Sequence, residues 1–197
     1  MTPSILPQTL SFIPGSTLAM SEVYEKYAPK IFFGLDAPHL HLLTNHLPIF
    51  VTLSGLFVLF FGLLRKNREM SQVALVLVFA GIAGGLLTYW LGQQSYKPVR
   101  GLADEVGQDW LDLHMERAEK VVWFFWMAGV AVAAAIVVAW KTPKFTFFAS
   151  ALAGLLGLGT VGLSGWIADA GGKIRHQEVR GEAAANMPED HSEPHSH

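Results

Sequence analysis

The chain has 197 residues, of which 51% are hydrophobic and 15% charged, and its formal net charge is -2 at pH 7. This composition offers no basic stripe for nucleic acid, and no glycine loop of the Walker or dinucleotide-binding type is present in the sequence. The chain contains no cysteine, which excludes disulfides, zinc–thiolate sites, iron–sulfur clusters and thioether-linked haem within it.

Residues 1–38 are predicted to form an arm outside the membrane domain, at the periplasmic surface. The arm is rich in proline, yet it also carries a set of large apolar side chains: Phe12, Ile13, Ile31, Phe32 and Phe33. A free extension in water does not need these side chains, so we expect the arm to lie along the membrane or against another subunit. Residues 1–10 lack the features of a secretory signal, so the first span is expected to direct insertion.

Four stretches are apolar enough, and long enough at about 20 residues, to cross a bilayer as helices. They are Leu42 to Leu64, Val73 to Leu91, Val121 to Trp140 and Phe145 to Ala168. No charged residue of the Lys, Arg, Asp or Glu type interrupts them, which favours helices over a membrane barrel. The sequence therefore predicts an all-α integral membrane protein, with an up-down-up-down four-helix bundle over residues 39–180.

Basic residues mark the two turns expected on the cytoplasmic side. The first turn carries Arg65, Lys66 and Arg68, and the third carries Lys141 and Lys144. By the positive-inside rule, both termini and the acidic loop between the second and third spans lie outside, which in a bacterium means the periplasmic side of the inner membrane. Residues 181–197, which include three histidines, are predicted to be a disordered tail.

Histidines gather at the outer ends of the predicted spans. His41 and His46 precede the first span, His114 the third, and His176 follows the fourth. Desolvating histidine is costly, so several of them near hydrocarbon predict a shared ligand such as haem iron or another metal. On one continuous helix, His41 and His46 point about 140° apart and cannot bind the same metal atom. A helix start at an Asn45 cap, with Pro48 in the first turn, is expected to separate them.

The other two histidines are expected to turn toward the bundle. One helix is predicted to run from the His114 motif, Asp112 to Ala118, into the third span, with His114 on the face that continues through Ala118. Gly171 and Gly172 are expected to let the chain turn sharply and fold His176 back across the outer end. Arg175 could then receive an anion such as a haem propionate.

Three segments together resemble a family of bacterial four-span inner-membrane proteins of unknown function. They are His41 to Pro48, with the pattern Asn-His-x-Pro, the His114 motif with Ala118, and Gly171 to Glu178, with Gly-Gly-x-Ile-Arg-His. The resemblance covers Leu40 to Arg180. Where the family carries Thr-Gly-Glu after the second span, this chain has Leu91-Gly92-Gln93. The resemblance implies the four-span architecture and the importance of these histidines, and it implies no activity.

The leading functional hypothesis is a b-type haem-binding subunit that passes electrons within a larger membrane redox complex. Two imidazoles on different helices can bind haem iron without thiols. His46 and His114 are the favoured axial pair, with His41 and His176 as second choices or as ligands of a second haem. Quinone and a periplasmic cytochrome are the expected redox partners. Two alternatives stay open: a copper, zinc or iron site made of the same histidines, and an accessory subunit without a cofactor.

Overall fold

The fold is given by a computed structural model that describes residues 24, 28 and 30–181. Most of the predicted arm (1–38) and nearly all of the predicted tail (181–197) lie outside these described residues. The expectations for Phe12, Ile13 and the tail histidines therefore stay predictions.

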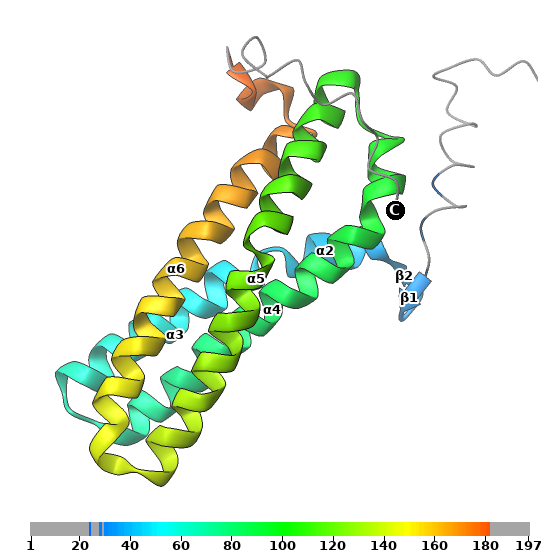
Figure 1. Cartoon of the computed structure of the whole chain (residues 1–197). Coiled ribbons are helices and arrows are strands. Elements are labelled where there is room, and N and C mark those ends of the chain that lie inside the picture. The colour runs from blue at the N-terminus through cyan, green and yellow to red at the C-terminus, as the bar shows by residue number, and fades with distance from the viewer. Residues whose placement is uncertain (1–23, 25–27, 29, 182–197) are drawn as a thin grey trace, which may run out of the picture.

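The described residues contain four helices that are long and apolar enough to cross a membrane, as predicted. The first of them consists of two pieces, the short α2 (Ala37–Thr44) and the longer α3 (Leu47–Leu64). The other three are α4 (Arg68–Arg100), α5 (Glu105–Lys141) and α6 (Thr146–Lys173), and the short 3-10 helix η1 (Pro143–Phe145) precedes α6. Consecutive long helices run in opposite directions (Figure 1). Residues 65–67 and 142–145 therefore connect the helices at one end, and residues 101–104 connect them at the other.

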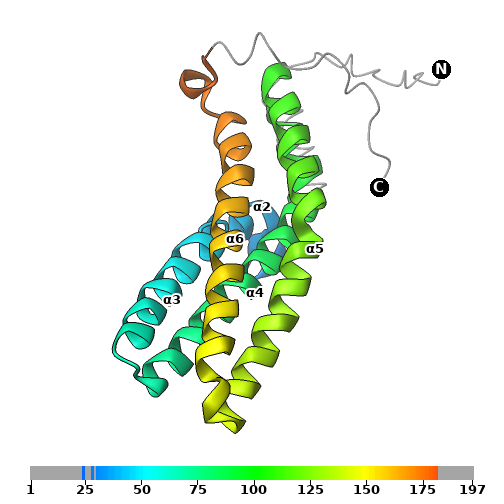
Figure 2. The same ribbon diagram turned by 60° about the vertical axis from the view of Figure 1, so that its left-hand side comes forward.

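Two helices extend well beyond the stretches that hydropathy identified. At 1.5 Å per residue, the 33 residues of α4 and the 37 of α5 measure about 50 Å and 55 Å, against a hydrocarbon core of about 30 Å. Figure 2 shows α5 and α6 rising beyond α2 at the end opposite residues 65–67. The prediction that one helix passes through His114 into the third span is confirmed.

The first span is broken where the sequence suggested, but by a different local arrangement. Pro48 lies in the first turn of α3, as predicted, yet Asn45 is the residue that ends α2 and does not cap α3. His46 occupies the position before α3 and makes no side-chain capping bond. The prediction of an Asn45 cap was therefore wrong, while its consequence holds: His41 lies on a separate short helix.

At the other end of the chain, Gly171 and Gly172 remain helical, so the expected sharp turn after the fourth span was wrong. The helix α6 ends at Lys173, and a short 3-10 turn, η2 (Gln177–Val179), follows it. The two glycines are therefore not turn residues, and Gly171 has a different role in the cavity described below.

The helices pack through small residues inside and expose large apolar residues outside. A side chain at Gly81 would meet Thr52 of α3 at 2.1 Å, and one at Gly85 would meet Phe125 of α5 at 2.5 Å, so both positions require glycine. Outward-facing residues include Phe57, Trp123 and Leu155, which are 66%, 71% and 69% exposed. An exterior of this kind is compatible with contact with a lipid bilayer.

One small element was not predicted: a two-stranded antiparallel hairpin formed by β1 (Lys30–Phe32) and β2 (Leu35–Asp36). It leads directly into α2, because Asp36 is the N-cap of that helix and its carboxylate accepts a hydrogen bond from the His39 backbone amide, 3.0 Å away. Pro38 lies in the first turn of α2, where its missing backbone N–H leaves no hydrogen bond unmade. The hairpin is therefore held at a fixed place beside the first span.

Candidate functional site

A cavity of about 630 Å³ lies among α2, α4, α5 and α6. Its volume falls within the range of about 300–1,000 Å³ that is typical of small-molecule sites. All the residues that the sequence singled out contribute to its lining: His41, His46, His114, Arg175 and His176. The prediction that these residues gather in one place is therefore consistent with the structure.

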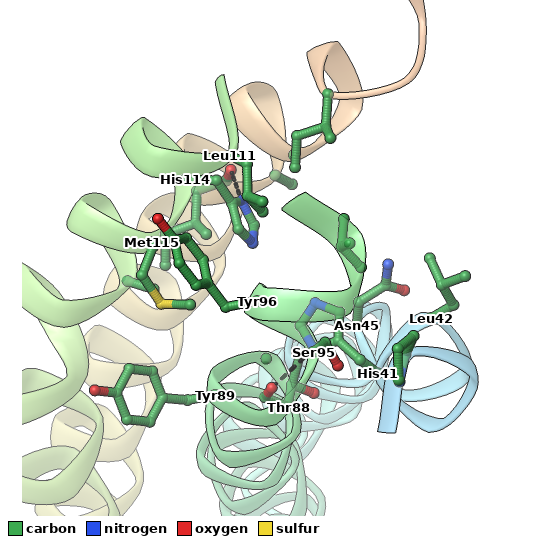
Figure 3. Close-up of a pocket in the computed structure, with 18 of the residues that line it drawn as sticks. His41, Leu42, Asn45, Thr88, Tyr89, Ser95, Tyr96, Leu111, His114 and Met115 are labelled. Carbon is green, nitrogen blue, oxygen red and sulfur yellow. Dashed lines mark hydrogen bonds between the residues drawn. The ribbon is translucent and has the colours of Figure 1, made fainter. Parts of the chain in front are cut away.

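Two of the four histidines face one another across the cavity. His41 from α2 and His114 from α5 have ring centroids 6.3 Å apart, with ring planes at 86° (Figure 3). These two residues are 73 positions apart in the chain, and the folding of the bundle alone brings them together. The facing pair is His41 with His114, whereas sequence reasoning favoured His46 with His114.

Both rings are held by the same kind of hydrogen bond. Nδ1 of His41 lies 2.9 Å from the carbonyl oxygen of Thr88 on α4, and Nδ1 of His114 lies 3.0 Å from that of Ile167 on α6. A carbonyl oxygen only accepts, so each Nδ1 carries the proton and donates it. In the neutral ring, Nε2 then keeps a free lone pair, which is the form that binds metals. Figure 3 shows these two nitrogens directed toward the space between the rings.

Each imidazole also lies against a glycine. An added side-chain carbon at Gly92 would stand 3.0 Å from Cε1 of His41, and one at Gly171 would stand 3.0 Å from both Cε1 and Nδ1 of His114. Both distances are tighter than normal van der Waals contact. A larger residue at position 92 must therefore displace the ring of His41, and one at position 171 must displace the ring of His114.

The two halves of the site repeat one arrangement. Gly92 follows Thr88 by four residues, and Gly171 follows Ile167 by four residues. Residues four apart lie one helical turn apart on the same face of a helix. In each helix, the histidine ring therefore passes over the glycine to reach the carbonyl oxygen one turn before it. Glycine at the later position leaves that path open. Backbone carbonyls leave no trace in a sequence, but the glycines at 92 in α4 and 171 in α6 are a usable signal.

The remaining predicted residues lie at the edge of the cavity. His46 is exposed, and its ring stacks on Phe50 with centroids 6.0 Å apart and an interplanar angle of 26°. His176 is also exposed, and its Nδ1 lies 2.9 Å from the Glu178 carboxylate. Arg175 donates a hydrogen bond of 2.6 Å to the carbonyl of Leu102. These three side chains are therefore placed to affect access to the cavity and its charge.

Two oxygens in the cavity wall are buried without a hydrogen-bond partner among the described residues. They are Oδ1 of Asn45 and Oγ of Ser164. Leaving such a group unsatisfied costs about 1–3 kcal/mol. Both residues line the cavity, but the two oxygens themselves are buried in its wall.

The histidine pair is not part of a larger ligand cluster. Within the described residues, no group of three or more His, Cys, Asp or Glu side chains is placed to hold a metal ion. A tetrahedral zinc site needs three or four protein ligands. Among the described residues, the two facing imidazoles are therefore fewer than such a site requires.

A salt bridge fastens the segment after α6, which contributes Ile174, Arg175 and His176 to the cavity lining, to the start of α5. The Arg180 guanidinium binds both carboxylate oxygens of Asp104 at 2.8 Å, and Gln177 donates to the same carboxylate at 2.7 Å. The hydrogen bonds from Arg180 hold the pKa of Asp104 well below its usual range. Since Asp104 also caps α5, one charged group fixes both segments.

Protonation of Asp104 is expected to release residues 174–181. A carboxylate with a lowered pKa in the folded state stabilises that state above its ordinary pKa of about 3.9, and the effect disappears as pH falls through the lowered value. Asp104→Asn should therefore produce at pH 7 the faster amide exchange of residues 174–181 that the parent protein shows only in acid. Asp109→Asn, at an exposed position of the same helix, serves as the control. Unchanged exchange in Asp104→Asn would show that the salt bridge does not hold this segment.

Comparison of the chain with protein-family models, with curated proteins and with solved structures finds no match. The case for a function therefore rests on the geometry of the cavity and on the chemistry of the residues that line it.

Proposed function

We propose that the protein is a membrane-embedded b-type haem-binding subunit for electron transfer, with His41 and His114 as the axial ligands. The separation of the two rings carries this proposal. Two metal–imidazole bonds of about 2.0–2.1 Å, with ~1.1 Å from each bound nitrogen to its ring centroid, place opposed centroids about 6.3 Å apart. The two rings lie 6.3 Å apart. Haem iron takes two such ligands on opposite faces and receives its other four from the macrocycle.

The hydrogen bonds behind the rings support the same assignment. A histidine that binds a metal through Nε2 usually donates its Nδ1 proton to a carbonyl or carboxylate, which fixes the ring and increases its basicity. Both rings make this bond here. The site is therefore preorganised, and binding requires little rearrangement of the two side chains.

The cavity wall fits a flat apolar ligand with a charged edge. Gly85, Gly92 and Ala118 contribute small apolar surface to the lining, which the exposed Arg175 also joins. In this proposal Arg175 attracts a propionate, for which it must exchange or share its bond to Leu102. Quinone and a periplasmic cytochrome are the proposed electron partners, within a larger membrane redox complex.

We further propose the bacterial inner membrane, with both termini on the periplasmic side. The support is the placement of Arg65, Lys66, Arg68, Lys141 and Lys144 at one end of the bundle and of the cavity toward the other. Because the chain has no cysteine, single cysteines report topology directly. A membrane-impermeant maleimide applied to intact spheroplasts should label Asp109→Cys and leave Lys66→Cys unlabelled until the membrane is opened. The reverse labelling pattern would show that the protein has the opposite orientation in the membrane.

A cofactor inventory of the purified full-length protein tests the proposed function. We expect a pyridine haemochrome spectrum of haem b at about one haem per chain, with copper and zinc far below one atom per chain. Stoichiometric copper or zinc without haem would favour the alternative in which the imidazoles bind a metal ion directly. Protein that contains none of these, and that does not bind added haemin, would favour an accessory subunit without a cofactor.

A further inference from the structure

We infer that the hairpin of β1 and β2 inserts its turn into the bilayer leaflet at the α2 end of the first span and so anchors α2 at the membrane surface. The hairpin exposes its largest apolar residues at the turn. Phe33 is 89% exposed and Phe32 is 60% exposed, and their rings pack against each other with centroids 4.3 Å apart. An aromatic pair of this kind at the tip of a hairpin is out of place in water.

The backbone conformation of the turn does not favour an aromatic residue at position 33. Phe33 and Gly34 have φ angles of 48° and 76°, and both lie in the left-handed region. Turns with two such residues favour Asn-Gly or Asp-Gly, and a bulky residue at the first position is strained. The chain therefore keeps a phenylalanine against the preference of the turn. Burial of its ring in an apolar medium supplies the compensation.

The position of the hairpin identifies lipid as that medium. In Figure 1 the hairpin lies beside α2, the short helix that leads into the first span. Exposed apolar residues continue from the hairpin into the span: Leu42 and Leu43 on α2 and Phe50 on α3 are 61–67% exposed. The tip thus extends the lipid-facing surface of the bundle.

The base of the hairpin is polar, as an element at the membrane interface requires. Lys30 is exposed at the start of β1, and the Asp36 carboxylate at the end of β2 accepts a hydrogen bond of 3.0 Å from the Tyr24 hydroxyl. Aromatic residues at the turn and a cation at the base match the apolar core and the phosphate layer of a bilayer. Since Asp36 also caps α2, insertion of the turn holds the helix that carries His41. The insertion does not depend on what the cavity binds.

Spin-label accessibility tests the insertion. The full-length protein carries no native cysteine, so a nitroxide can be attached to Phe33→Cys alone, after reconstitution into vesicles of phosphatidylcholine and phosphatidylglycerol. Oxygen concentrates in hydrocarbon, and a nickel chelate stays in water. Phe57→Cys, on α3, gives the lipid reference, and Val179→Cys, in η2, gives the aqueous reference; these side chains are 66% and 54% exposed.

We expect the oxygen-to-nickel accessibility ratio at position 33 to approach that at position 57 and to exceed that at position 179 several-fold. A ratio equal to that at position 179 would overturn the inference, because the turn would then lie in water. Low accessibility to both reagents would overturn it too, because the turn would then be covered by another protein subunit. Lys30→Cys, at the base of the same hairpin, should give an intermediate value.

Discussion

Alanine at either His41 or His114 is expected to abolish the six-coordinate, low-spin haem spectrum while the protein still inserts and purifies. Each substitution removes one of two axial ligands and opens one side of the iron. The remaining histidine should hold the haem in a five-coordinate, high-spin form, with affinity reduced by a factor of at least ten. Optical spectra of the ferric and ferrous protein, with haemin titration of the variants, measure both effects.

His46→Ala and His176→Ala are the matched controls, since both residues line the same cavity without facing His114. Both variants should keep the low-spin spectrum. If His46→Ala loses it and His41→Ala keeps it, the axial pair is His46 with His114, and α2 must rearrange when the ligand binds. Two low-spin haems per chain in the parent protein would instead require His46 or His176 as ligands of a second haem.

Valine at Gly92 or at Gly171 is expected to weaken haem binding about 10–100-fold, the usual effect of disturbing the groups that orient a metal ligand. Each new side chain begins 3.0 Å from the ring that it must displace, and that displacement stretches the Nδ1 bond to Thr88 or Ile167. Overpacking of this kind also costs about 1–3 kcal/mol of stability. Haemin titration, together with ¹⁵N shifts of the histidine rings in the haem-free protein, separates the two effects.

Gly172 offers a close control, because a side chain there meets nothing within 4 Å. Gly172→Val should leave both the haem affinity and the histidine shifts unchanged. The ring shifts make the outcome independent of haem: if the Nδ1 proton of His114 is undisturbed in Gly171→Val, the glycine does not position the ring. Alanine at Gly92 and Gly171 should give smaller effects of the same kind, because the rings need to move only a few tenths of an ångström.

The four long apolar helices could be predicted because a segment able to cross hydrocarbon must be apolar along its whole length. Long apolar runs without charge therefore located the helices. The polar extensions of α4 and α5 obey no such requirement, and hydropathy placed their ends at Leu91 and Val121, whereas the helices end at Arg100 and begin at Glu105. The short hairpin before α2 was missed because strands of two or three residues leave no periodic pattern.

The candidate site could be predicted in its residue types and in its location, but not in its pairing. Sequence spacing shows that His41 and His46 need a break between them, but it does not show which of the two the broken helix turns inward. That choice depends on Thr88, whose carbonyl binds His41 and whose hydroxyl donates to the Thr44 carbonyl at 2.9 Å. Both bonds join residues more than 40 positions apart. Contacts of this kind exist only after the helices have packed.

The electron paramagnetic resonance spectrum of the oxidised, haem-loaded protein tests most directly whether His41 and His114 hold one haem between them. The angle between the two axial imidazole planes governs the anisotropy of a low-spin ferric haem, and these planes stand at 86°. We expect the strongly anisotropic low-spin signal of near-perpendicular imidazoles, and we expect it to be lost in both His41→Ala and His114→Ala. A high-spin signal, or a folded protein that takes up no haem, would contradict it.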